Sequence, residues 1–399
     1  MPPRRLRPID SPVTLTVDGA EVAARAGEPI AIALYAARRI VLGRSVKYHR
    51  ARGAACFSGR CDGCLMRVDG APSVRTCRKK AAHGTVVETQ NVLGTAGLDL
   101  LSAADVLFAG GLNHHEMFTW SKPVNRVMQE VARHVAGLGR LPDEARVAAG
   151  VERAACDVCV IGAGESGTAC AEALVRGGAD VVVLEEEDTS RAPPVRTATS
   201  AVGVFDETDG ARIVLAVGER GATVITPRLV VIATGRAESA EAFEGNDLPG
   251  VLSLDAAERL FSSGVLPGER PVIAGQGDRA HALAARFASA GARPVRILRD
   301  DVVRARGRSS VRLVETAGGE KLACDVLVVE GRASARYELA AQAGVEVVFD
   351  GEVFDLVASK DDGTTRHPRV LVAGSAARVD DAAAHGARVG QKALEVLRG

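Results

Sequence analysis

The first 40 residues alternate between apolar and polar positions in a way that predicts two strands and a helix. Residues 13–17 alternate with a period of two, Asp18-Gly19 is typical of a tight hairpin turn, and residues 21–24 return as a second strand. An apolar stretch at residues 30–39 predicts a helix. The pattern indicates a small α+β domain at the N-terminus.

In the second half of the chain, apolar strands alternate with helical segments. The pattern predicts strands at 157–161, 181–184, 229–232, 271–274, 295–298 and 370–373, and helices at 168–176 and 281–290. Strands that alternate with helices are typical of parallel sheets in α/β proteins. The chain is therefore expected to join an α+β domain to an α/β region.

Four cysteines in a C-x4-C-x2-C-x12-C pattern follow the N-terminal domain pattern: Cys56, Cys61, Cys64 and Cys77. Ser58, Gly59 and Gly63 are small enough to let three thiolates wrap one side of a compact cluster, and the fourth ligand follows a hairpin with a turn at Asp69-Gly70. The spacing predicts a [2Fe-2S] cluster. Structural zinc is the competing interpretation, although zinc ribbons and knuckles use a second C-x2-C pair or histidines. Unliganded thiols are the third.

The other four cysteines, Cys156, Cys159, Cys170 and Cys324, lie in apolar segments. Cys156 and Cys159 form a C-x2-C pair around a predicted strand. Such thiols are expected to be core residues rather than a redox pair.

A G-x-G-x-x-G turn joins the strand at 157–161 to the helix that follows it. Gly162 permits the tight turn, Gly164 lets the backbone approach a pyrophosphate, and Gly167 lets helix and strand pack closely. Glu185, about 20 residues on, can accept a hydrogen bond from an adenosine ribose. The turn predicts FAD or NAD, and the alternative is a glycine-rich turn that binds nothing.

A second turn, with Gly275 and Gly277 and with Ala280 in the third position, lies before the helix at 281–290. Its following strand ends at Arg299 instead of an acidic residue. Either Arg299 favours a phosphorylated ribose, so that the turn holds NAD(P), or the turn is scaffold without a ligand.

Composition excludes several classes of function. Fifty basic and fifty acidic residues leave no net charge, which argues against nucleic acid or an anionic membrane as the main partner. No apolar run is long enough for a membrane span, so a cytoplasmic protein is expected. The sequence also shows no Ser-His-Asp or Cys-His arrangement at a recognisable elbow, and no catalytic residue is assigned.

The N-terminal elements and the cysteine loop resemble plant-type ferredoxins over residues 11–90. The resemblance is to the short β-grasp form of this fold, which is found in the small iron-sulfur subunits of molybdenum hydroxylases and of hydrogen cyanide synthase. The two glycine turns, with Thr234-Gly235 and Gly374 after the apolar runs, resemble two-dinucleotide-binding flavoproteins. Ser375 stands where those proteins usually carry Asp, and only about 70 residues separate Gly162 from Ala233.

Residues 47–53, Lys-Tyr-His-Arg-Ala-Arg-Gly, resemble the Lys-Tyr-His-Arg-Pro-Arg-Gly segment of the alpha subunit of heterotetrameric sarcosine oxidase. Residues 118–120 and 139–142 resemble its linker, and residues 248–251 and 266–268 resemble subunits of hydrogen cyanide synthase and opine oxidase. The resemblance implies a ferredoxin-like domain (1–90), a helical linker (91–150), an FAD-type domain (151–250 with 351–399) and an inserted NAD-type Rossmann domain (251–350).

The resemblance implies an electron-transfer subunit of a heteromeric amine or amino-acid oxidase or dehydrogenase of the sarcosine, proline or opine type. An amino-acid-oxidase-like flavoprotein would be its partner, and an external acceptor would take the electrons. Two alternatives remain: a self-contained NAD(P)H-dependent reductase fused to its own ferredoxin, and a structural subunit with a vestigial flavin site. Ser375 and the shortened flavin domain are the reasons for the second alternative.

Overall fold

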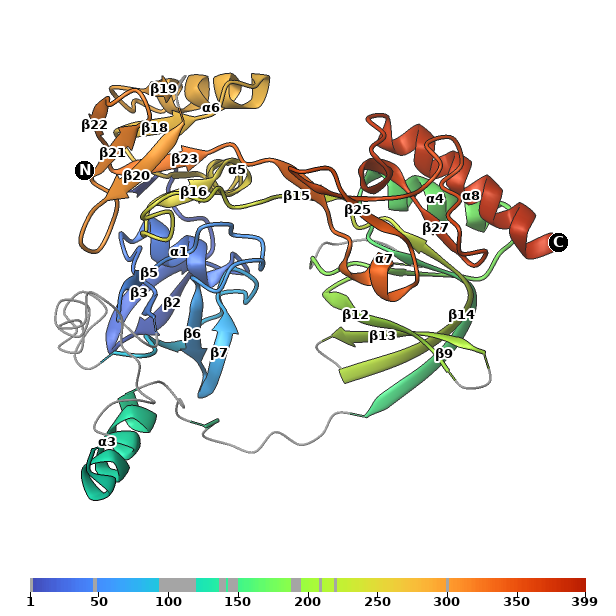
Figure 1. Cartoon of the computed structure of the whole chain (residues 1–399), viewed down its shortest axis with the longest axis horizontal. Coiled ribbons are helices and arrows are strands. Elements are labelled where there is room, and N and C mark those ends of the chain that lie inside the picture. Colours follow the sequence, from blue (N-terminus) through green and yellow to red (C-terminus); the bar gives the residue numbers. More distant parts are fainter. Residues whose placement is uncertain are drawn as a thin grey trace. The chain divides into compact units, whose positions relative to one another are not determined.

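A computed structural model describes residues 3–45, 49–92, 120–135, 141–142, 150–187, 195–207, 210–218, 221–298 and 301–399. The chain divides into two compact units, residues 1–145 with 240–331 and residues 146–239 with 332–399 (Figure 1). Each unit is built from two separate stretches of chain. No helix among the described residues is long and apolar enough to cross a membrane.

A mixed sheet of five strands forms the N-terminal part of the first unit. Its strand order is β3 (Ala20–Arg25), β2 (Pro12–Val17), β8 (Val86–Glu88), β6 (Leu65–Val68) and β7 (Ala71–Arg75). Asp18 and Gly19 both have positive φ, as the predicted hairpin turn requires. Helix α1 (Ile30–Ala36) packs its buried side chains into the same core. It ends three residues before the predicted end, and Arg38 beyond it has a positive φ of 68°.

A parallel sheet of four strands forms the rest of the first unit. Its order is β16 (Val251–Ser253), β23 (Val326–Val329), β18 (Pro271–Ala274) and β19 (Arg296–Leu298), with α5 (Leu254–Ser262) and α6 (Asp278–Ser289) between strands. The antiparallel strands β20 (Val302–Arg306), β21 (Leu313–Thr316) and β22 (Lys321–Ala323) form a separate small sheet. The strands predicted at 271–274 and 295–298 and the helix predicted at 281–290 correspond to β18, β19 and α6 of this sheet.

The two parts of the first unit share one hydrophobic core. Strand β1 (Arg4–Arg5) pairs with β17 (Val265–Leu266), and the Tyr35 hydroxyl donates a hydrogen bond to the Pro267 carbonyl at 3.2 Å. Buried side chains of α1 and of α5 and α6 belong to the same cluster. Outside this core lie the short strands β4 (Gly43–Arg44) and β5 (Ala51–Arg52) and the helix α3 (Lys122–Val135).

A sheet of seven strands forms the centre of the second unit. Its order is β11 (Val195–Arg196), β10 (Val181–Leu184), β9 (Val151–Ile161), β14 (Gly221–Ile232), β13 (Arg212–Gly218) and β12 (Thr199–Asp206), and β27 (Val370–Val372) also pairs with β14. Helices α4 (Glu165–Arg176) and α8 (Ala382–Arg398) contribute to the core on one face. Helix α7 (Glu338–Gln342) and strand β26 (Phe354–Leu356) contribute to the core on the other.

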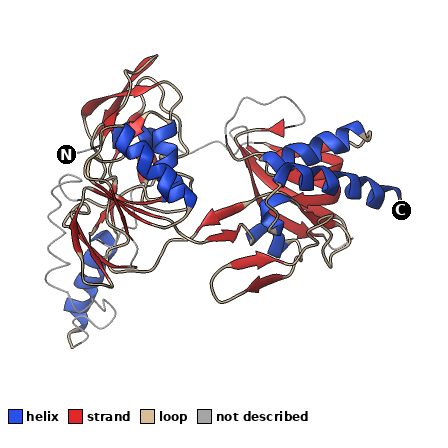
Figure 2. Ribbon diagram, turned by 90° about the horizontal axis from the view of Figure 1, so that it is seen from above, coloured by secondary structure: helices blue, strands red, loops and turns tan. Residues whose placement is uncertain are grey.

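Helices α4 and α8 pack against each other at short range, and they lie side by side near the C-terminus in Figure 2. A Cβ atom at Gly386 would lie 2.1 Å from the Ser166 carbonyl oxygen, and one at Gly390 would lie 2.8 Å from that of Cys170. Glycine at both positions therefore lets the two backbones touch. The unit is completed by strands β15 (Arg236–Glu238), β24 (Ala333–Ala335) and β25 (Val347–Phe349) and the short helix η2 (Gly374–Ala377).

Candidate functional site

The cysteine loop lies between β5 and β6 of the first unit and is held by close backbone contacts. A Cβ atom at Gly63 would lie 1.9 Å from the Gly53 carbonyl oxygen, so the position accepts no side chain. Gly59 has a φ of 78°, a conformation that glycine adopts without strain. The small residues of the loop are therefore needed for its path.

The four cysteine side chains form two pairs. The sulfurs of Cys56 and Cys61 are 3.4 Å apart, and Cys64 hydrogen-bonds to Cys77 through its side chain. The backbone N–H groups of Ser58 and Cys61 donate to the Cys56 sulfur at 3.4 and 3.3 Å. All four thiols are free of disulfides.

Hydrogen bonding within each pair separates the pKa values of its two thiols. Cys61 lowers the pKa of Cys56 to about 4, and Cys77 lowers the pKa of Cys64 to about 7. The same hydrogen bonds raise the pKa values of Cys61 and Cys77. One thiol of each pair therefore ionises more readily than the other, and thiolates are the ligand form that iron and zinc bind.

The arrangement in pairs fits a cluster with two irons better than a single metal ion. A [2Fe-2S] cluster is bound by four thiolates, two on each iron, whereas a structural zinc ion is bound by four ligands around one centre. The donor set and its grouping therefore favour iron-sulfur over zinc.

Apolar side chains close the inner side of the loop. Phe57, next to Cys56, is buried, and its ring meets that of Tyr35 edge-on with centroids 5.5 Å apart. Cys64 and Cys77 are themselves buried. The thiols on that side are thus shielded from water, one of the factors that set the potential of an iron-sulfur centre.

The first glycine turn joins β9 to α4 in the second unit. Gly162 has a φ of 103°, and a Cβ there would lie 2.4 Å from the Ala233 carbonyl oxygen. A Cβ at Gly167 would lie 1.9 Å from the Gly162 carbonyl oxygen. Gly164 caps the helix without a side-chain hydrogen bond, and a Cβ at this position would meet nothing within 4 Å. The side of Gly164 that a Cβ atom would occupy is therefore open, as close approach of a pyrophosphate to the start of α4 requires.

The other residues predicted for the first site lie around the same turn. The Glu185 carboxylate accepts a hydrogen bond from the Ala163 N–H at 2.8 Å, beside the turn and at the end of β10. Thr234 and Gly235 follow Ala233 at the end of β14, and the Thr234 hydroxyl donates to the Arg336 carbonyl at 3.0 Å. A Cβ at Gly374 would lie 2.4 Å from the Ser166 hydroxyl oxygen, so Gly374 borders the first turn of α4.

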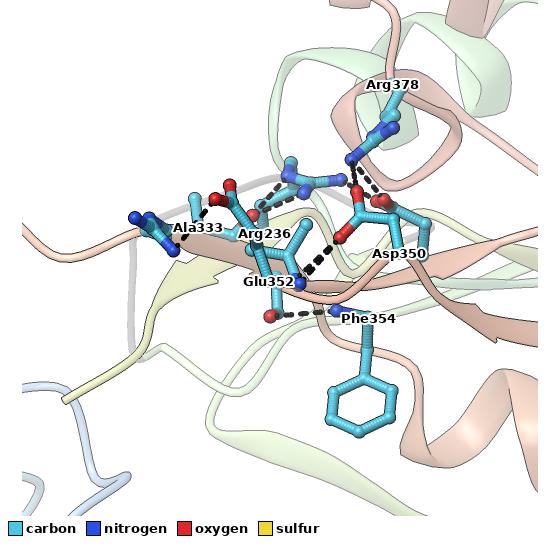
Figure 3. A network of polar contacts seen from close by, with 10 residues as sticks. Arg236, Ala333, Asp350, Glu352, Phe354 and Arg378 are labelled. Carbon is cyan, nitrogen blue, oxygen red and sulfur yellow. Dashed lines mark hydrogen bonds and ion pairs between the residues drawn. The ribbon is translucent and has the colours of Figure 1, made fainter. Parts of the chain in front are cut away.

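A network of ion pairs, which the sequence analysis missed, connects the segments after β14 and β27. Arg236, next to Gly235, donates to the buried Asp355 carboxylate, and Arg378, at the end of η2, pairs with the same carboxylate. Figure 3 shows Arg378 also reaching Asp350, whose carboxylate accepts from the Glu352 N–H. The Val353 N–H and Arg378 lower the pKa of Asp350 to about 2. Asp355 thus ties together the two turns that border the first site.

Replacing Asp355 by asparagine is expected to destabilise the second unit by about 3 kcal/mol, because Arg236 would lose its partner in a largely buried position. Chemical denaturation of the full chain measures the change. Glu352→Gln in the same hairpin is the matched control: its pair with Arg332 is exposed on both sides and is expected to contribute less than about 1 kcal/mol. Equal losses in the two variants would contradict the role given to Asp355.

The second glycine turn joins β18 to α6, and Gly277 caps that helix. The Gly277 N–H donates to the Glu330 carboxylate at 3.0 Å, a contact that the sequence analysis did not anticipate. Arg299 lies outside the described residues, as do Lys47 and Tyr48 of the segment at 47–53 and residues 118–119 and 139–140 of the predicted linker.

Cys156, Cys159, Cys170 and Cys324 are buried, and desolvation raises the pKa of each. Cys156 and Cys159 lie within β9 with their side chains in one apolar core. High thiol pKa values make these cysteines poor nucleophiles, so they are core residues as the sequence predicted.

Comparison with known proteins agrees with this description. Residues 10–92 match the family described as 2Fe-2S iron-sulfur cluster binding domain. The chain is 28% identical over 422 residues to the sarcosine oxidase subunit alpha of Rhizobium meliloti (strain 1021), an alignment that covers 88% of this chain and 43% of that protein. The chain therefore spans less than half the length of that relative.

Two further similarities cover the N-terminal part and the whole fold. A segment of 79 residues, 20% of this chain, is 37% identical to hydrogen cyanide synthase subunit HcnA of Pseudomonas aeruginosa and covers 75% of that protein. The crystal structure of L-proline dehydrogenase from P. horikoshii superposes with a TM-score of 0.74 and 22% identity over 99% of this chain and 76% of that one. The predicted fold class is confirmed: a ferredoxin-like domain precedes a flavoprotein-type dinucleotide fold. The chain belongs to the 2Fe-2S iron-sulfur cluster binding family through its N-terminal region, and it is a fused iron-sulfur and flavoprotein-like chain related to sarcosine oxidase alpha subunits.

Proposed function

We propose that this chain is an electron-transfer subunit of a heteromeric amine or amino-acid oxidase or dehydrogenase. Cys56, Cys61, Cys64 and Cys77 would hold a [2Fe-2S] cluster in the first unit. The turn at Gly162, Gly164 and Gly167, with Glu185, would hold the FAD or NAD molecule in the second. A bound [2Fe-2S] cluster exchanges one electron at a time, and a bound flavin exchanges one or two.

The observation that carries the proposal is the grouping of the four thiols into two pairs. The loop that carries them has a path that residues larger than its glycines could not adopt. Pairs at Cys56–Cys61 and Cys64–Cys77 suit two irons, and amides directed at Cys56 stabilise its thiolate. The chain's own residues thus bind, orient and shield a redox group. The relatedness to subunits of sarcosine oxidase supports amine or amino-acid oxidation as the process that supplies the electrons.

The open first turn supports a dinucleotide in the second unit. The N-terminal amides of α4 have no side-chain cap and can receive a pyrophosphate, and the Glu185 carboxylate lies beside them. Thr234, Gly235 and Gly374 border this space and would contact the remainder of the cofactor. The amine would be oxidised on a partner flavoprotein of the amino-acid oxidase type, because the related sarcosine oxidase proteins are alpha subunits, a designation that implies other subunits.

Reduction by different donors tests the proposal. The visible absorbance of the anaerobic protein alone should not bleach on addition of NADH or NADPH. It should bleach when the partner flavoprotein and an amine substrate are both present, and sarcosine and proline are the first substrates to try. Rapid loss of visible absorbance with NADH or NADPH alone would favour a self-contained reductase. A partner that reduces an artificial dye but leaves this chain oxidised would support a scaffold role.

A further inference from the structure

The two glycine turns have the same backbone construction, and one residue in the neighbouring strand distinguishes them. In the second unit Ile161 pairs with Ile232, and the Ala233 N–H donates to the Ile161 carbonyl at 2.9 Å. In the first unit Ala274 pairs with Val329, and the Glu330 N–H donates to the Ala274 carbonyl at 2.8 Å. Glu330 therefore holds the position at the second turn that Ala233 holds at the first.

This difference fills the second turn with a carboxylate. Glu330 accepts the hydrogen bond of the Gly277 N–H at 3.0 Å. A Cβ atom at Gly275 would lie 2.6 Å from Glu330, and one at Gly277 would lie 2.7 Å from its Oε1 atom. At the first turn, by contrast, a Cβ atom at Gly164 would meet nothing within 4 Å, and Ala233 presents only a methyl group; the carboxylate beside that turn, Glu185, bonds the Ala163 N–H.

The Glu330 carboxylate occupies the place that a dinucleotide would need. Pyrophosphate binds such turns through the free amides at the helix N-terminus and through close approach to the second glycine. Here the amide of that glycine already bonds an anion of the protein, and a pyrophosphate brought to the same amide would meet a like charge. A dinucleotide could bind only after Glu330 moved away.

We propose that Glu330 closes the second turn to dinucleotides, so that of the two glycine turns only the first can bind one. Glu330 is thus a specificity-determining residue of the inserted domain. The glycines of the second turn then have a role in packing and not in binding a dinucleotide. The inference concerns a turn separate from the cysteine loop and from the first site, so it stands or fails independently of the function proposed above.

Equilibrium binding of NAD to the purified full chain tests the proposal, together with hydrogen exchange of the peptide that spans residues 275–280. The wild type should show no protection of that peptide at millimolar NAD. Glu330→Ala places at the second turn the residue type that the first turn has. This variant should bind one additional NAD per chain, with an affinity at the second turn at least tenfold higher than that of the wild type. The peptide at 275–280 should then become protected from exchange. Glu330→Gln removes only the charge and should give a smaller gain.

Glu320→Ala, on the exposed turn between β21 and β22, is the matched control and should leave NAD binding unchanged. Protection of residues 275–280 by NAD in the wild type would overturn the proposal. So would a Glu330→Ala protein that melts at the wild-type temperature and gains no binding. Because the exchange readout is local to the second turn, loss of the cluster or of the first dinucleotide would not imitate either result.

Discussion

Replacing Cys64 by alanine is expected to reduce the iron content of the chain from about two atoms to nearly none, with loss of the visible absorbance. The reason is that each thiol pair would hold one iron, and a ligand lost from one pair leaves the cluster without its fourth thiolate. Iron and acid-labile sulfide analysis of the anaerobically purified variant measures the effect.

Cys324→Ala is the matched control for this substitution. Both sulfur-bearing residues are fully buried in the first unit, but Cys324 lies in an apolar core cluster away from the other cysteines. The control should keep its iron and lose only the modest stability that removal of a buried sulfur costs. A Cys64→Ala protein with full iron content, or a Cys324→Ala protein without it, would contradict the assignment of the ligands.

Replacing Gly164 by alanine is expected to weaken dinucleotide binding at the first turn at least tenfold while the protein stays folded. The added methyl group meets no protein atom within 4 Å, so it would project into the space left for the pyrophosphate. The free energy of unfolding should change by less than about 1 kcal/mol, since only a cap residue is altered. Titration of the nucleotide-free chain with FAD and with NAD gives the two affinities.

Gly150→Ala is the control for the Gly164 variant, because Gly150 also has open space around its Cβ position but lies outside the turn. It should bind as the wild type does. Gly162→Ala is expected to behave differently from both, because its Cβ would clash with the Ala233 carbonyl and its φ is positive. That variant should lose stability as well as binding. Wild-type affinity in the Gly164→Ala protein would contradict the proposed place of the pyrophosphate.

Features that depend on short stretches of chain could be predicted from the sequence. The hairpin at Asp18-Gly19, the cysteine loop and both strand-turn-helix units follow from local spacing and periodicity, and the structure shows each of them. The start of α1 at Ile30 was predicted correctly, but the starts of α4 and α6 were predicted late. Helix α4 begins at Glu165 and α6 at Asp278, because a glycine just outside each helix serves as its cap while the first turn is polar.

Contacts between distant segments could not be predicted in this way. Glu330 is more than 50 residues from Gly277 and reaches it only because β23 lies beside β18. The one sequence signal was an acidic residue directly after an apolar strand. Asp355 likewise meets Arg236 and Arg378 through the packing of separate segments. The grouping of the thiols into two pairs depends on the conformation of the folded loop. The cysteine spacing alone does not determine which thiols pair.

The most direct test of the cluster assignment is metal and sulfide analysis of the anaerobically purified wild-type chain, with an absorbance spectrum before and after reduction by dithionite. The account predicts about two irons and two acid-labile sulfides per chain, and visible absorbance that bleaches on reduction. One zinc ion per chain without iron or sulfide, bound by the same four cysteines, would contradict it.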